Sequence, residues 1–230
     1  MSTHSVHNAA LNRQTGLLRS LVSQDPSLAN SPDVDGRMPL HWAASSGAFD
    51  IVQYLLDQKA DVDRADNSGW TPLHIAAQGM NRLYASSSAP ERTSIERTTR
   101  ASHHSSKSRV DIGRLLISRG ADINARDNAN QLPLHRAATT GSTGFISLLL
   151  KPLEGSPKPR LNTADRVGNT PLHLAMESAH AEAACLLIEA GADRTRENLD
   201  GEMPEDLEGV GGQEQRRAKA YVVERCGKRS

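Results

Sequence analysis

Apolar residues recur along the chain in short blocks with spacings of three and four residues. The clearest blocks are 51–56, 145–150 and 183–188, which read Ile-Val-x-Tyr-Leu-Leu, Phe-Ile-x-Leu-Leu-Leu and Ala-Ala-x-Leu-Leu-Ile. Such spacing places the apolar side chains on one broad face of a helix. A second apolar segment precedes each block; it begins with Pro-Leu-His in the clearest copies, with Ala two residues after the His. The pattern therefore predicts pairs of short helices, the first of each pair starting at a proline.

The Pro-Leu-His segments belong to a longer repeat. They begin at Pro39, Pro72, Pro133 and Pro171, and Pro204 continues the series without the Leu-His. Asp or Asn lies six residues before each proline, and Gly or Asn lies three before it, where a tight turn needs a positive φ. Period and motif match the ankyrin repeat. We therefore expect an all-α ankyrin-repeat solenoid, in which helix-turn-helix units with β-turn fingers stack as one domain over residues 1–230.

Two steps between the prolines depart from the 33-residue period. The step of 38 residues after Pro133 places its surplus in a lengthened loop at 151–160. The step of 61 residues after Pro72 fits either one repeat with an insertion or two repeats with a deletion. In the two-repeat alignment, apolar residues at 112–117 fall in register with a second helix. The residues alone leave both alternatives open.

The segment 80–108 is rich in serine and poor in apolar residues. Between Arg82 and Arg109 the chain holds six basic and two acidic residues, a net charge of +4. We interpret this segment as a solvated loop, because it offers little apolar surface to bury. A phosphorylation-responsive loop, an anion-binding loop and a wrongly predicted coding segment are the alternatives.

Composition narrows the classes of function. Aromatic residues make up only 3% of the chain, so the core must be aliphatic. The 27 basic and 27 acidic residues cancel, and no global field draws the chain to nucleic acid or to an anionic membrane. We find neither a signal-peptide pattern nor an apolar run of membrane-spanning length. Cys185 and Cys226 have no C-x-x-C spacing, which favours reduced thiols in the cytoplasm or nucleus.

No catalytic motif accompanies the repeat. The chain has no Gly-rich phosphate loop, G-x-S-x-G or H-E-x-x-H pattern. Four histidines occupy equivalent positions in successive units, at His41, His74, His135 and His173. We expect each to hydrogen-bond backbone groups, in a ladder too widely spaced to bind one metal ion. The sequence therefore predicts neither an enzyme nor a metal or cofactor site.

The remaining candidate is a protein-binding surface. In an ankyrin stack, the fingers and the exposed side of the first helices form a concave face on which side chains are free to vary. Trp and Arg are the residues most enriched in binding hot spots, although the tryptophans could instead only pack between fingers. The candidate residues are Asp35, Arg37, Trp42, Ser46, Ser68, Trp70, Ile75, Asn130, Arg136 and Asn169.

Four stretches resemble the gankyrin family of proteasome assembly chaperones: 36–43, 66–77, 134–138 and 168–175. His-Trp in one unit, Gly-Trp in the next and His-Arg-Ala-Ala later go beyond the general ankyrin consensus. The resemblance implies a non-catalytic protein whose concave face binds the C-terminal domain of one AAA ATPase subunit of the proteasome base. We expect a monomer in the cytoplasm and nucleus. A generic ankyrin adaptor for signalling or transcription proteins is the alternative.

The resemblance also implies roles for single residues and a number of repeats. Arg37, Trp42, Trp70 and Arg136 would contact the ATPase domain, and Asp35 and Asp66 would face its basic groups. Family members have seven repeats, which favours two repeats in the 61-residue step. The expected units are 1–32 as an N-terminal cap, 33–65, 66–98, an eroded 99–126, 127–164, 165–197, and 198–230 as a C-terminal cap.

Overall fold

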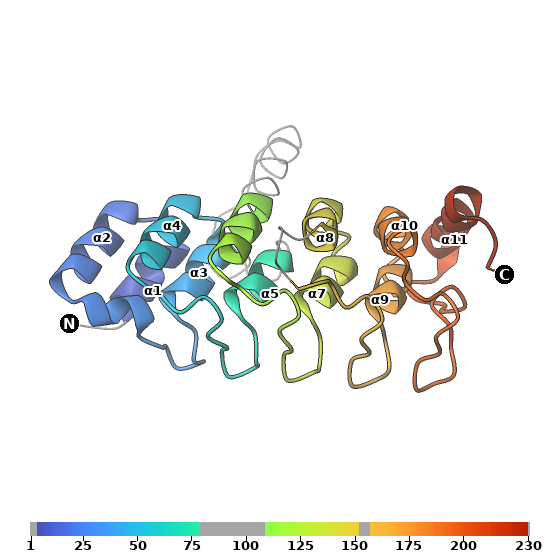
Figure 1. Ribbon diagram of the computed structural model, residues 1–230, viewed down its shortest axis with the longest axis horizontal. Helices are drawn as coiled ribbons and strands as arrows, with labels where there is room; N and C mark the ends of the chain where they lie inside the picture. The colour runs from blue at the N-terminus through green and yellow to red at the C-terminus, as the bar shows by residue number, and fades with distance from the viewer. Residues whose placement is uncertain (1–3, 79–108, 152–156, 230) are drawn as a thin grey trace.

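The computed structural model describes residues 4–78, 109–151 and 157–229. Its helices form two rows beside a row of loops, which we call the fingers (Figure 1). The inner row contains α1 (His4–Leu11), α3 (Pro39–Ser46), α5 (Pro72–Ala77), α7 (Pro133–Thr139) and α9 (Pro171–Glu177). The outer row contains α2 (Thr15–Gln24), α4 (Phe49–Asp57), a helix at 109–118, α8 (Thr143–Leu150), α10 (Ala181–Glu189) and α11 (Gly212–Cys226).

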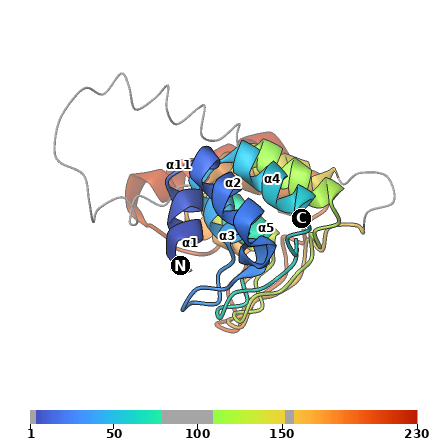
Figure 2. The same ribbon diagram turned by 90° about the vertical axis from the view of Figure 1, so that its left-hand side faces the viewer.

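Successive units repeat the same arrangement along the stack. A short 3-10 helix, η1 (Pro26–Asn30), leads from α2 to the first finger. In the end-on view of Figure 2, the fingers of successive units overlap, and so do α4 and the outer helix that follows it. The described residues contain no β-strand. The predicted all-α stack of helix pairs and fingers is confirmed.

The histidine of each Pro-Leu-His segment joins its unit to the next. The backbone N–H of Met38 donates to Nδ1 of His41 (3.0 Å), so the ring proton lies on Nε2. Nε2 donates in turn to the carbonyl oxygen of Trp70 in the next finger (3.0 Å). The same pair of bonds occurs at His74, His135 and His173, with the carbonyl oxygens of Gln131, Asn169 and Glu202 as acceptors. The predicted histidine ladder is confirmed.

The side chain at the first position of each finger fixes its turn. Oδ1 of Asp33 accepts the backbone N–H groups of Asp35 (2.9 Å) and Arg37 (2.8 Å). Each finger after the first also donates one backbone N–H to the finger before it, as Asn67 does to the oxygen of Asp35 (2.9 Å). The equivalent anchors are Asp66, Asp127, Asp165 and Asn198. The fingers therefore form one continuous hydrogen-bonded row.

The turn glycine is required by the neighbouring finger as well as by φ. Gly69 has a φ of +81°, and a Cβ at this position would lie 2.6 Å from the backbone nitrogen of Asn128. Asn130 takes the equivalent place in the next finger with a φ of +63°. Both residues match the predicted positive φ at this position.

The fingers at 66–70 and 127–131 are direct neighbours. Nε2 of His74 reaches the oxygen of Gln131 (3.1 Å), and the N–H of Asn128 donates to the oxygen of Ser68 (3.0 Å). No repeat separates them, so 66–126 is one unit with an insertion between its two helices. The division into 66–98 and 99–126 is wrong, and the structure has six units rather than seven in the part of the chain that it describes. The serine-rich segment 80–108 lies outside the described residues.

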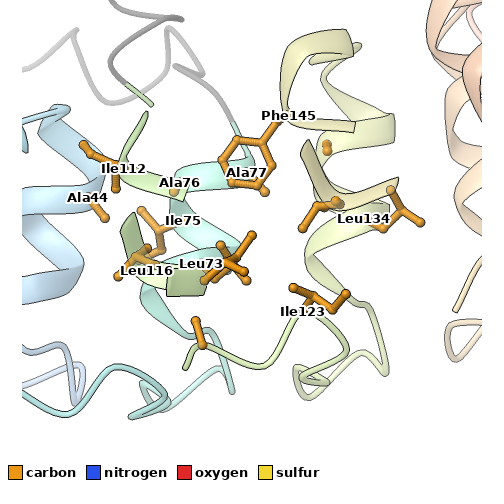
Figure 3. Close-up of a cluster of buried hydrophobic side chains, with 14 of the residues drawn as sticks. Ala44, Leu73, Ile75, Ala76, Ala77, Ile112, Leu116, Ile123, Leu134 and Phe145 are labelled. Carbon is orange, nitrogen blue, oxygen red and sulfur yellow. The ribbon is translucent and has the colours of Figure 1, made fainter. Parts of the chain in front are cut away.

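The outer helix at 109–118 completes the unit that α5 begins. Figure 3 shows Ile112 and Leu116 of this helix beside Leu73 and Ala76 of α5, with Phe145 of α8 on the other side. Among the described residues, Phe145 is the largest fully buried side chain, and Leu, Ile, Val and Ala make up most of the remaining core. Small alanines on the inner helices let neighbouring units approach closely. The predicted aliphatic core is confirmed.

Different helices cover the core at the two ends of the stack. At the N-terminal end, α1 and α2 bury Val6, Leu18 and Val22. At the C-terminal end, α11 packs against α10, and Nε2 of Gln215 donates to the carbonyl oxygens of Met176 (2.8 Å) and Leu207 (3.2 Å).

The described part of the predicted loop at 151–160 is non-helical and is fixed at one point. The N–H of Arg160 donates to Oδ1 of Asn124 (3.0 Å), and Nδ2 of Asn124 donates to the oxygen of Lys158 (3.0 Å). Residues 152–156 lie outside the described residues. Among the described helices, none has the length and apolar content needed to cross a bilayer.

Candidate protein-binding surface

Most candidate residues lie in the fingers or in the first turn of the inner helices, and we call this region the finger surface; Ser46 lies apart from it, at the C-terminal end of α3. The Asp anchors hold the first four fingers and Asn198 holds the last, and the ladder histidines join α3, α5, α7 and α9 to the next finger. Side chains near the end of a finger therefore lie close to the inner helix of their own or the next unit. Two clusters that pair a tryptophan with an arginine result from this arrangement.

The first cluster is built around Trp42 of α3. Its indole Nε1 donates to Oδ2 of Asp33 (2.8 Å), and the guanidinium carbon of Arg37 lies 5.3 Å from the ring centroid. Arg37 also donates through Nε to Oδ2 of Asp66 in the next finger (3.1 Å). Burial opposes ionisation of Asp33, but hydrogen bonds from Arg37 N–H, Trp42 and Asp35 N–H lower its pKa below the usual value. Asp33 therefore stays a carboxylate and orients the indole.

The second cluster pairs Trp70 of one finger with Arg136 of α7 in the next unit. The guanidinium carbon lies 4.2 Å from the ring centroid, and Nη2 donates to Oδ2 of Asp127 (2.7 Å). Burial opposes ionisation of Asp127, but the bonds from Arg136 and from the N–H of Gln131 lower its pKa. The cluster spans two units, so Trp70 packs between fingers, as the alternative interpretation expected, and still remains partly exposed.

Both clusters present tryptophan rings that are already fixed. A ring stacked by an arginine on one face loses little rotamer freedom when a partner covers the rest of it. Each arginine is also neutralised by an aspartate whose side chain is nearly buried, 2% exposed for Asp66 and 1% for Asp127. The clusters therefore offer flat, amphipathic and nearly neutral contact area rather than unpaired positive charge.

Asp66 does not face outward. Its Oδ1 accepts the N–H groups of Ser68 (2.8 Å) and Trp70 (2.9 Å), and its Oδ2 accepts Arg37. The prediction that it faces a partner's basic groups is wrong, because both oxygens are used inside the protein. Its place six residues before a proline was the available signal for this structural role.

Ile75 is the other candidate that the fold uses internally. It occupies the position equivalent to Trp42 and Arg136, yet only 9% of its surface is exposed. Figure 3 shows it on α5 within the core cluster, near Ile112 and Leu116 of the helix at 109–118. The prediction that it is a contact residue is wrong, because an aliphatic side chain at this position packs inward.

The small polar candidates differ in what remains available to a partner. Asp35 is exposed, and its carboxylate makes no hydrogen bond or ion pair with the described residues. Ser68 is also exposed. Ser46 donates its hydroxyl to the oxygen of Ala10 (3.0 Å). These two serines therefore differ: Ser68 is exposed, whereas Ser46 is half-buried and its hydroxyl is bonded within the protein.

Asn130 and Asn169 connect neighbouring fingers. Nδ2 of Asn130 donates to the oxygen of Ala164 (2.6 Å), and Oδ1 of Asn169 accepts Nδ2 of Asn198 (3.1 Å). Gln131 adds a similar bond from Nε2 to Oδ2 of Asp165 (2.8 Å), which repeats the link from Arg37 to Asp66. These side chains stiffen the row of fingers, and they are only partly exposed.

Sequence reasoning missed Asp33 and Asp127 as parts of the finger surface. They orient Trp42 and Arg136, so they position contact residues without being exposed themselves. The signal that could have found them is the distance of nine residues from each aspartate to the side chain it binds. In the described residues, no group of three His, Cys, Asp or Glu side chains could hold a metal ion.

The stack of fingers and helix pairs defines the protein as an ankyrin-repeat protein. A family model of ankyrin repeats (three copies) matches residues 6–85 and 100–198, which is more than half of the chain. The chain is also similar to parts of much longer proteins. Human inversin is 28% identical over 86% of this chain and 16% of its own length, and mouse neurogenic locus notch homolog protein 1 is 29% identical over 82% and 6%.

Another relative matches along most of both chains. A protein of Saccharomyces cerevisiae, the probable 26S proteasome regulatory subunit p28, is 35% identical over 90% of this chain and 94% of its own length. Within the ankyrin-repeat proteins, the chain therefore belongs to the family of this subunit, the gankyrin family.

Proposed function

We propose that this protein is a non-catalytic assembly chaperone of the proteasome base. It binds the C-terminal domain of one AAA ATPase subunit on its finger surface and masks that domain. Docking of the ATPase on the core particle is then delayed until the base is complete. The observation that carries the proposal is the similarity to the yeast proteasome subunit along nearly the whole of both chains. The proposal places the protein, as a monomer, in the cytoplasm and nucleus.

The geometry of the finger surface supports protein binding. Trp42 and Trp70 are held in place by arginines and remain partly exposed, which is the arrangement expected of hot-spot residues. Asp35 adds an exposed carboxylate without an internal partner among the described residues, and it lies two residues before Arg37. A basic group on the partner would find its counter-charge there, at the edge of a nearly neutral aromatic surface.

The experiment is a pull-down of each recombinant proteasomal ATPase C-terminal domain with the full chain. We expect one domain to be retained, and we expect Trp70→Ala to weaken its binding by about 2 kcal/mol or more, as for hot-spot residues. Tyr54→Ala is the matched control, because Arg19 lies over the ring of Tyr54 at 5.1 Å in the outer row, away from the fingers. This variant should bind like the wild type.

Two outcomes would contradict the proposal. Retention of no ATPase domain by a folded wild-type protein would leave a general ankyrin adaptor. Equal losses for Trp70→Ala and Tyr54→Ala would show that the finger surface is not the contact. Circular dichroism of each variant separates lost contacts from lost folding.

A further inference from the structure

The last finger, 197–202, does not use its carboxylates for folding. Its anchor is neutral, because Oδ1 of Asn198 accepts the N–H groups of Asp200 (3.0 Å) and Glu202 (2.9 Å). In the four preceding fingers an aspartate has this role. Glu197, Asp200 and Glu202 make no side-chain hydrogen bond or salt bridge with the part of the chain that the structure describes. Three negative charges are therefore available to solvent on one finger.

Two apolar side chains accompany these charges at the tips of the last two fingers. Val167 is 54% exposed and Leu199 is 77% exposed. The backbone N–H of Leu199 donates to the oxygen of Val167 (3.2 Å), so the two residues are neighbours across the fingers. The tips of these two fingers therefore present two solvent-exposed apolar side chains on adjacent backbone segments.

Two other finger joints place a polar side chain where Leu199 lies. Asn67 donates Nδ2 to the oxygen of Val34 (3.3 Å), and Asn128 donates Nδ2 to the oxygen of Asn67 (3.0 Å). Leu199 lacks this bond between fingers. The leucine side chain at this tip therefore contributes no hydrogen bond between fingers, whereas the two asparagines do.

We propose that Val167 and Leu199 form a docking surface for a partner segment that carries an aliphatic side chain next to lysine or arginine. The aliphatic group covers the apolar pair, and the basic groups meet Glu197, Asp200 and Glu202. Arg166 is exposed beside Val167 and repels the basic groups of the partner, so these groups lie toward the finger 197–202. This surface lies in the last two fingers, whereas the tryptophan clusters belong to earlier units, and the proposal does not depend on ATPase binding.

The test is a titration of the full chain, labelled at Leu and Val methyl groups, with a short blocked peptide that alternates leucine and lysine. We expect saturable shifts of the Leu199 and Val167 methyl signals. Leu199→Ser should weaken binding about ten-fold, as for the loss of one buried aliphatic contact. Combined Glu197→Gln, Asp200→Asn and Glu202→Gln should weaken it as well and remove most of its salt dependence.

Val34→Ser is the matched control. Val34 is a finger-tip valine that is 82% exposed, but the next finger has polar Asn67 beside it. This variant should bind the peptide like the wild type, and a peptide that alternates leucine and glutamate should not bind.

Three results would overturn the proposal: unchanged Leu199 signals, equal binding of the acidic peptide, or equal losses for Val34→Ser and Leu199→Ser. Shifts that grow with protein concentration in the absence of peptide would assign the pair to contact between two copies and would also overturn it. ATPase binding that depends on Trp70 but not on Leu199 leaves the two surfaces independent.

Discussion

The units at 33–65 and 66–126 differ by 28 residues in length and nevertheless stack alike. In the first, Asp33 anchors the finger and His41 reaches the next finger at 3.0 Å. In the second, Asp66 anchors the finger and His74 reaches the next finger at 3.1 Å. The extra residues lie between α5 and the helix at 109–118, so they leave the finger and both helices of the unit in their usual places (Figure 1).

The turns that follow the outer helices show the same agreement. The N–H of Asp61 donates to Oδ1 of Asn30 (2.9 Å), and the N–H of Asp122 donates to Oδ1 of Asp63 (3.0 Å). A unit is therefore defined by hydrogen bonds at its two ends, one set at the fingers and one in these turns. Its length in sequence can change as long as both sets are kept.

Acid should weaken all histidine joints, and we expect this effect to be the largest. Burial lowers the pKa of His41 and His74, and it lowers the pKa of His135 to about 4. An unfolded histidine gains its proton near pH 6.5, whereas the lowered pKa of His135 keeps that ring neutral in the folded protein until about pH 4. Stability is therefore present above pH 6.5 and is lost as the pH falls toward 4, with His135 alone contributing on the order of 3 kcal/mol.

Urea unfolding at several pH values between about 7 and 4 measures this loss. If the joints at His41 and His74 are equivalent, replacing either by Asn should remove a similar part of the pH slope. A urea midpoint that stays constant down to pH 4 would contradict the ladder as the source of acid sensitivity.

Replacing the histidine of a single joint by alanine should have the second largest effect on stability. His74→Ala leaves the N–H of Thr71 and the oxygen of Gln131 without their partners and opens a cavity. We expect a loss of about 2–4 kcal/mol in the free energy of unfolding, and a similar loss for His41→Ala. A loss at His74 that is smaller by more than about 1 kcal/mol would show that the inserted residues loosen their joint. His180→Ala removes a half-buried imidazole outside the ladder and should cost less than either.

The comparison also explains which features the sequence could predict. Proline, histidine, aspartate and glycine at fixed distances specify local turns and helix starts, so the fingers and the ladder followed from them. The number of units did not follow, because the apolar residues at 112–117 mark an outer helix whichever inner helix it accompanies. The roles of Asp66 and Ile75 were wrong because exposure depends on neighbouring fingers and helices, which a single unit does not reveal.

Deleting residues 86–106 should change stability only slightly. If this segment is the solvated loop expected from its sequence, shortening it to about one third saves about 1 kcal/mol of chain entropy, so the free energy of unfolding should rise by no more than this amount. Urea unfolding checks it, with the slope against urea as a second readout. A loss of several kcal/mol together with a smaller slope would mean that a folded repeat had been removed, which would restore the two-unit interpretation.

The smallest expected effect concerns a charge found at the joint of the longer unit. Asp63 accepts the N–H of Asp122 there, whereas Asn30, Asn124 and Asn162 accept at the other described joints of this row. Burial and then the charges of Asp122 and Asp61 raise the pKa of Asp63, so its charged form is disfavoured in the folded protein. Asp63→Asn keeps the acceptor and removes the charge, and it should stabilise the protein by about 0.5 kcal/mol at neutral pH and low salt. Protonation of Asp63 removes this unfavourable charge from the wild type, so the stability difference between the two proteins should shrink in acid. Salt should also reduce the difference by screening the charges. A less stable Asp63→Asn protein at neutral pH would show that this joint needs its carboxylate, and that the two units differ in their outer turns after all.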